Sequence, residues 1–184
     1  MQMHSTLQFL MSSITLFVSR ERVTKGSYAK PAERRISMFR PSRILVPTDF
    51  SDPSRKAIEF AIDLAQSYNA QVFVLHVITE LTNQCAVDYC LDYQDFQALD
   101  QKIMKTAEER LRSLVDSVPN SPHVPLQMSV RKGKADHEIL KEEEEKQIDL
   151  LVIASLGHGF HGYLIGSVAR NILKGSKCPV FLVK

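Results

Sequence analysis

Two stretches of sequence decide the fold: RILVPTDFSD at residues 43–52 and LLVIASLGHGFHGYLIGSVAR at residues 150–170. Each begins as an apolar, β-branched run and changes abruptly to small, hydroxyl-bearing and acidic residues. A buried parallel strand has this composition where its carboxyl end opens into a ligand crevice. Together the two stretches predict a nucleotide pocket at the carboxyl edge of a parallel sheet.

Glycines follow the second apolar run and carry the phosphate-binding interpretation. They are Gly157, Gly159, Gly162 and Gly166, and the pair Gly166-Ser167 opens the helical pattern VARNILK. A glycine backbone can approach an anion closely and adopt positive φ, and the free N–H groups at a helix start attract negative charge. Ser167 is equally suited to act as the N-cap of that helix.

In the first stretch, Thr48 and Asp49 leave the strand as a hydroxyl and a carboxylate. The carboxylate can accept hydrogen bonds from an amino group or a ribose hydroxyl. Asp49 can also cap the helix that starts near Asp52-Pro53. The pattern alone favours neither role over the other.

Strands and helices alternate along the chain. Strands are predicted over 43–48, 71–77, 125–131, 148–154 and 178–183, and helices over 53–68, 93–117, 134–146 and 166–174. Five strands separated by four helices require right-handed parallel crossovers. Within this pattern His76 is predicted to be a core histidine, residues 79–92 an irregular stretch, and the glutamates at 142–145 a solvated helix face.

At these residues the chain resembles the universal stress protein family, whose ATP-binding members carry G-x2-G-x9-G-[ST] after the fourth strand. The resemblance covers roughly residues 42–184 and continues through VRKGKADHEIL and IDLLVIAS to the closing CPVFLVK. Here the glycine pattern is Ala154-x2-Gly157-x8-Gly166-Ser167, with alanine in first place and one residue fewer before Gly166. Leu156 stands where the family usually has histidine.

The resemblance implies an α/β fold of the adenine nucleotide α-hydrolase-like type. Its five-stranded parallel sheet has the order 3-2-1-4-5 with helices on both faces, which brings Asp49 beside the glycine loop. The implied ligand is ATP or another adenine nucleotide, with or without Mg²⁺, and Val77 offers backbone groups to adenine. The implied nucleotide-binding residues are Pro47, Thr48, Asp49, Val77, Ala154, Ser155, Gly157, Gly159, Gly166, Ser167, Val168 and Ala169.

The expected function is adenine-nucleotide binding in a stress response, by a nucleotide-sensing dimer. One alternative is a dimeric interaction protein of the same family that binds no nucleotide. Another is a weak ATPase or nucleotidyl transferase. Asp49 is the one obvious carboxylate at the predicted crevice and the glycine loop contains no lysine, whereas hydrolysis needs a positioned base and usually a metal held by carboxylates. No catalytic residue is assigned.

Motifs exclude a dinucleotide site and a P-loop, and they do not favour a metal site. GHGFHG at 157–162 matches G-x-G-x-x-G, but a dinucleotide site needs an acidic residue about twenty positions later, and no carboxylate follows Asp149. The P-loop pattern G-x4-G-K-[ST] is absent. Cys85 and Cys90 lack a nearby histidine pair, so no metal site is predicted.

Charge and cysteine content indicate the partners and the compartment. Residues 1–40 contain seven Lys or Arg against two Glu, so their net charge is +5 and the remainder of the chain carries −3. An acidic domain without clustered Lys and Arg is a poor nucleic-acid binder. The three cysteines contain no C-x-x-C pair, which fits a reducing compartment and predicts a cytoplasmic location. CPVFLVK at 178–184 is an unprotected apolar edge strand, and it predicts a homodimer through this strand.

The N-terminal segment stands outside the alternating pattern. LQFLMSSITLFV at 7–18 is too short to span a bilayer, and no Lys or Arg precedes it as in a secretory signal. No membrane association is therefore predicted. We expect residues 1–41 to be a disordered arm, or an extension upstream of a true start at Met38, and residues 42–184 to form the domain.

Overall fold

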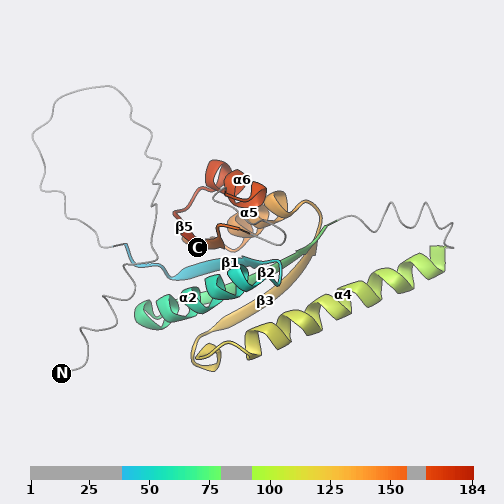
Figure 1. Ribbon diagram of the computed structural model, residues 1–184, viewed down its shortest axis with the longest axis horizontal. Coiled ribbons are helices and arrows are strands. Elements are labelled where there is room, and N and C mark those ends of the chain that lie inside the picture. The colour runs from blue at the N-terminus through green and yellow to red at the C-terminus, as the bar shows by residue number, and fades with distance from the viewer. Residues whose placement is uncertain (1–38, 80–92, 157–164) are drawn as a thin grey trace, which may run out of the picture.

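A five-stranded parallel sheet forms the centre of the protein (Figure 1), whose computed structural model describes residues 39–79, 93–156 and 165–184. Its strands follow the order β3-β2-β1-β4-β5, and every neighbouring pair is parallel. The predicted order 3-2-1-4-5 is confirmed. The strands are β1 Arg43–Thr48, β2 Gln71–Ile78, β3 Leu126–Lys132, β4 Leu150–Ala154 and β5 Val180–Val183.

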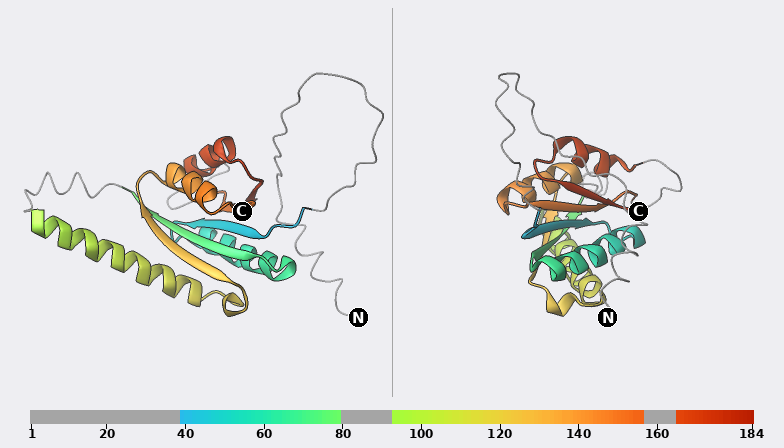
Figure 2. Two further views of the ribbon diagram at one scale, coloured as in Figure 1. Left: turned by 180° about the vertical axis from the view of Figure 1, so that it is seen from behind. Right: turned by 90° about the vertical axis from the view of Figure 1, so that its left-hand side faces the viewer.

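Helices cover both faces of the sheet, as the views from behind and from the side show most clearly (Figure 2). They are α2 Asp52–Tyr68, α4 Tyr93–Asp116, α5 Ala135–Glu145 and α6 Ser167–Gly175. The pair α2 and α4 lies on one face, and the pair α5 and α6 lies on the other. A short 3₁₀ turn at Ser121–His123 precedes β3 and was not predicted from the sequence.

The two buried faces explain why β1 is apolar without interruption. Ile44 and Val46 point into the core under α2, whereas Leu45 between them points into the core under α5 and α6. All three side chains are fully buried. A strand covered on both sides needs apolar residues at consecutive positions, and burial of each such side chain stabilises the fold by about 1.5–3 kcal/mol.

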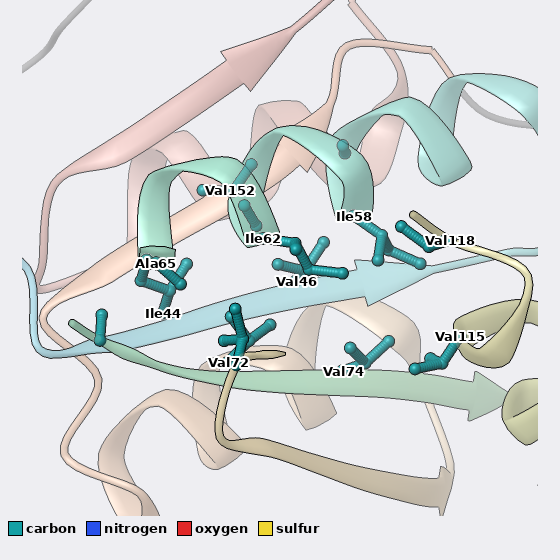
Figure 3. Close-up of a cluster of buried hydrophobic side chains, with 14 of the residues drawn as sticks. Ile44, Val46, Ile58, Ile62, Ala65, Val72, Val74, Val115, Val118 and Val152 are labelled. Carbon is teal, nitrogen blue, oxygen red and sulfur yellow. The ribbon is translucent and has the colours of Figure 1, made fainter. Parts of the chain in front are cut away.

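Helix α2 begins and ends at clear capping residues. Ser51 is its N-cap and accepts a hydrogen bond from the backbone N–H of Ser54, and Asn69 ends the helix with φ 55° in the left-handed region. Its buried stripe lies against β1 and β2, and Figure 3 shows Ile58 and Ile62 directed at the strands. The helix predicted over residues 53–68 is confirmed.

The prediction that residues 142–145 form a solvated helix face is wrong for two of the four glutamates. Glu142 and Glu143 are buried, at 1% and 4% exposed. Glu142 accepts hydrogen bonds from Ser129 and Arg131 on β3. Glu143 accepts them from Ser176 and from the backbone N–H groups of residues 177 and 178. These partners replace water, which allows the two carboxylates to be buried.

Several predictions concern residues outside the described ranges. The arm at 1–38, the cysteines at 85 and 90, and the glycines at 157, 159 and 162 all lie there. The proposed boundary at residue 41 is therefore untested. Across the ranges that are described, no helix is long and apolar enough to cross a membrane.

Candidate functional site

A cavity of about 400 Å³ opens at the carboxyl ends of β1, β2 and β4. We call it the first cavity. All ten described residues of the predicted nucleotide site line it. They are Pro47, Thr48, Asp49, Val77, Ala154, Ser155, Gly166, Ser167, Val168 and Ala169. The structure thus brings them together from segments more than a hundred residues apart, whereas Gly157 and Gly159 lie outside the described residues.

The turn after β1 is held by its own polar side chains. Thr48 Oγ1 accepts a hydrogen bond of 3.1 Å from the backbone N–H of Phe50. Asp49 Oδ1 accepts one of 3.1 Å from the backbone N–H of Ser51 and another from the Ser51 hydroxyl. Asp49 therefore does not cap α2 itself but orients Ser51, which is the cap. Of the two roles that the sequence left open for Asp49, the capping role thus belongs to Ser51, and the Asp49 carboxylate lines the first cavity.

Phe50 adopts the unusual φ of 64° for a non-glycine residue. Its ring lies 4.2 Å from the His76 ring, centroid to centroid, and the Arg110 guanidinium lies 4.3 Å from the Phe50 centroid. A bulky residue keeps such a backbone conformation only where its surroundings hold it. The contacts with His76 and Arg110 hold Phe50 in this conformation, and they link α4 to the rim of the first cavity.

His76 is half-buried and lines the first cavity, so its assignment to the core is only partly correct. Its Nδ1–H donates to the carbonyl oxygen of Thr48 at 2.9 Å, across the β1–β2 pair. Burial lowers the pKa of His76 from its ordinary value of 6.5, and the Arg110 charge adds to this, while the Thr48 hydrogen bond and Asp49 oppose it. The imidazole is therefore neutral at pH 7.

Gly166, rather than Ser167, is the N-cap of α6, so the capping role predicted for Ser167 is wrong. The Gly166 N–H donates to the carbonyl oxygen of Ser155 at 2.9 Å, which joins the start of α6 to the end of β4. Its φ of −56° is accessible to any residue. A Cβ at this position would lie 3.5 Å from the Ser155 oxygen, an ordinary contact. Neither the backbone conformation at residue 166 nor the space around it therefore requires a glycine.

Other lining residues were missed in the sequence. They are Ser54, Leu75, His76, Thr79, Ala135, Ile139, Ile153 and Leu156. Ala135 and Ile139 come from α5, which crosses the sheet between β3 and β4. The strand order could have revealed them, because a crossover from β3 to β4 must pass over β2 and β1.

The lining is mainly apolar on one side and polar at the strand ends. Leu75, Val77, Ile139 and Ile153 supply apolar surface, and Asp49 is the one carboxylate among the described lining residues, which include no Lys or Arg. Within the described ranges, no three His, Cys, Asp or Glu residues gather where they could hold a metal ion. Such a cavity suits a flat, weakly polar ring with a few directed hydrogen bonds.

Comparison with known proteins identifies a family that this chain matches. The sequence profile of the universal stress protein family matches residues 41–184. Universal stress protein MJ0531 of Methanocaldococcus jannaschii is 28% identical over 143 residues, which cover 77% of this chain and 81% of that protein.

Solved structures show the same fold. Protein MJ0577 of Methanocaldococcus jannaschii superimposes with a TM-score of 0.67 at 24% identity, over 79% of this chain and 97% of that one. The universal stress protein of Archaeoglobus fulgidus in complex with dAMP superimposes with a TM-score of 0.55 at 19% identity, over 79% of this chain and all of that one.

Proposed function

Because the chain belongs to the universal stress protein family, we propose that it is a stress-response protein that binds an adenine nucleotide in the first cavity. The observation that carries the proposal is that the ten described residues implied by the family resemblance all line one cavity at the switch point of the sheet. The cavity is also close in volume to small-molecule sites, which measure roughly 300–1,000 Å³.

The chemistry of the lining supports a nucleotide orientation. The apolar surface of Leu75, Val77 and Ile153 suits the base. Gly166 and Ser167 lie at the start of α6, where backbone N–H groups favour a phosphate. The Asp49 carboxylate, which also lines the cavity, suits a ribose hydroxyl or an amino group. A neighbour in fold holds dAMP, and this agrees with an adenine nucleotide as the ligand class.

The main alternative is a dimeric interaction protein that binds no nucleotide. Its support is the departure from the family's glycine pattern, with Ala154 in first place and one residue fewer before Gly166. Weak ATPase or nucleotidyl transferase activity is the other alternative. Because the described residues of the lining offer one carboxylate and no lysine, we favour binding without efficient turnover.

The test is mass spectrometry of small molecules released from freshly purified protein, followed by calorimetry with AMP, ADP and ATP. Gly166→Ala and Gly166→Val form a matched pair of variants. The alanine Cβ meets only ordinary contact, so the fold should tolerate it. Valine adds two further methyl groups at a residue of the cavity wall and should weaken binding by about tenfold or more. Unchanged affinity in Gly166→Val for every adenine nucleotide would contradict the phosphate assignment.

We further propose that the protein acts as a homodimer in the cytoplasm, paired through β5. This strand is one edge of the sheet. The carbonyl oxygens of Pro179 and Val183 accept from β4, so the backbone groups of Val180 and Leu182 point away from the sheet. Their side chains are already buried within the chain. Dimerisation would therefore add backbone pairing and cover Phe181, which is half-buried and stacks on Phe60.

A further inference from the structure

A second cavity of about 450 Å³ adjoins the first. The two cavities share four lining residues, Thr79, Ala135, Ser167 and Val168. Ser167 and Val168 form the start of α6, beside which the proposed nucleotide phosphate would lie. A ligand that extends past its phosphate in this direction enters the second cavity.

The second cavity contributes polar groups of its own. Besides the shared residues, it is lined by Gly133, Lys134, Asp136 and Asn171. These supply an ammonium group, a carboxylate and an amide from two helices. Carboxylate and amide side chains hydrogen-bond sugar hydroxyls, and an ammonium group pairs with phosphate.

The carboxylate is held in place by the protein itself. Asp136 Oδ2 accepts a hydrogen bond of 2.7 Å from the Asn171 amide, and Oδ1 accepts one of 3.1 Å from the backbone N–H of His137. The Asp136 side chain is only 13% exposed. Despite its partial burial, hydrogen bonds from Asn171 and Lys134 lower the pKa of Asp136. A charged, oriented carboxylate is therefore part of the wall at neutral pH.

The ammonium group, by contrast, is exposed. The Lys134 side chain is 77% exposed, and its nitrogen lies 3.2 Å from Asp136 Oδ2. An exposed pair of this kind is weak. Lys134 can turn to a ligand phosphate at small cost, while Asp136 keeps its bonds to Asn171 and the α5 backbone.

We propose that the two cavities together bind an adenine nucleotide that carries a second sugar beyond its phosphates. The base lies in the first cavity, the phosphates pass Ser167 within reach of Lys134, and the second sugar lies against Asp136 and Asn171. The inference rests on the proposed function, since it assigns the base to the first cavity. It adds a class of ligand, because AMP and ATP leave the second sugar subsite empty.

The experiment is calorimetry of the full chain with AMP, ADP and ADP-ribose, the last being ADP with a second ribose. The unmodified protein should bind ADP-ribose about tenfold more tightly than either AMP or ADP, the amount expected from one or two hydrogen bonds to a charged group. In Asn171→Ala this advantage should largely vanish while the AMP affinity stays unchanged, and in Lys134→Ala the ADP-ribose affinity should fall because the ligand phosphates lose the ammonium group. Lys141→Ala is the matched control, an exposed lysine of α5 that does not line either cavity, and it should keep the advantage.

The outcomes separate this inference from the proposed function. If AMP binds but ADP-ribose binds no better, the proposed function stands and the second subsite is refuted. Equal losses for AMP and ADP-ribose in Asn171→Ala also refute it, because they indicate a structural role for Asn171. If none of the three ligands binds, the proposed function fails and the inference fails with it.

Discussion

At the scale of single residues, the turn after β1 shows how one carboxylate serves both the fold and the site. Asp49 orients the N-cap of α2 through Ser51 and also lines the first cavity. Removing the whole side chain would disturb both. A substitution that keeps the oxygen acceptor and removes the charge separates the two roles.

Asp49→Asn is that substitution. The asparagine oxygen can still accept from the backbone N–H of Ser51, so thermal stability should change little. Nucleotide affinity should fall by about 1–3 kcal/mol, because a charge-assisted hydrogen bond to the ligand becomes a neutral one. Thermal melting and calorimetry on the same sample measure both effects. A variant that is less stable but binds normally would leave Asp49 with a structural role only.

His76 predicts a pH dependence of stability. Its pKa is lowered in the folded state, mainly by burial, so the unfolded chain binds the proton more readily than the folded one. The contribution of His76 is complete above its ordinary pKa of 6.5 and is lost as the pH falls below that value. His76→Asn keeps an N–H donor for Thr48 but does not titrate.

Chemical denaturation at about pH 7.5 and about pH 5.5 checks this prediction. The free energy of unfolding of the unmodified protein should fall more over this interval than that of His76→Asn. Carboxylates and other histidines contribute equally to both proteins. Identical falls would mean that the folded environment of His76 does not disfavour its protonated form.

The residues of the first cavity were predictable to the extent that they lie in local patterns. Thr48 and Asp49 end an apolar run, and Gly166 and Ser167 start a helical one. His76 was assigned to the core because its neighbours in sequence are apolar, although its position at the end of β2 brings it to the cavity. Ile139 was missed because α5 reaches the cavity through tertiary packing.

At the scale of elements, helix α5 shows where composition misleads. Four consecutive glutamates look like a solvated face, yet two of them, Glu142 and Glu143, are buried. Their partners, Arg131 on β3 and the loop from α6 to β5, are distant in sequence and invisible to a local pattern. The strands and helices themselves were predicted within a few residues, because apolar periodicity is a local signal.

Glu143→Ala tests this element. One oxygen of Glu143 accepts from the Ser176 hydroxyl and from the backbone N–H groups of residues 177 and 178. Losing the acceptor would leave two part-buried N–H groups without that partner, which should cost about 3 kcal/mol. Glu144→Ala is the matched control, because that side chain is 59% exposed. This variant should lose much less stability than Glu143→Ala. Equal urea midpoints for the two variants would mean that the hydrogen bonds of Glu143 to residues 176–178 do not stabilise the fold.

At the scale of the whole molecule, the strand order places the two cavity-lining segments after β1 and β4 side by side and leaves β5 at an edge. The order followed from resemblance to the family. Without it, the alternation of strands and helices predicts a parallel sheet but not which strands are neighbours. Whether β5 pairs with a second copy is a property of the assembly and does not follow from the fold of one chain.

Val180→Pro tests pairing through β5. The Val180 N–H points away from the sheet, and an edge strand tolerates proline at such a position within one chain. The proline removes the donor that a second copy would need, so light scattering should report a monomer where the unmodified protein is a dimer. Val180→Ala keeps the N–H and should remain dimeric. An unmodified protein that is monomeric at tens of micromolar would refute the dimer outright.

The central claim is that the first cavity binds an adenine nucleotide, and titration calorimetry of the nucleotide-free full chain with AMP tests it most directly. We predict saturable binding with one site per chain, weakened by Gly166→Val and retained in Gly166→Ala. No heat of binding with AMP, ADP or ATP, together with no nucleotide released from the freshly purified protein, would contradict the claim and favour the dimeric interaction protein.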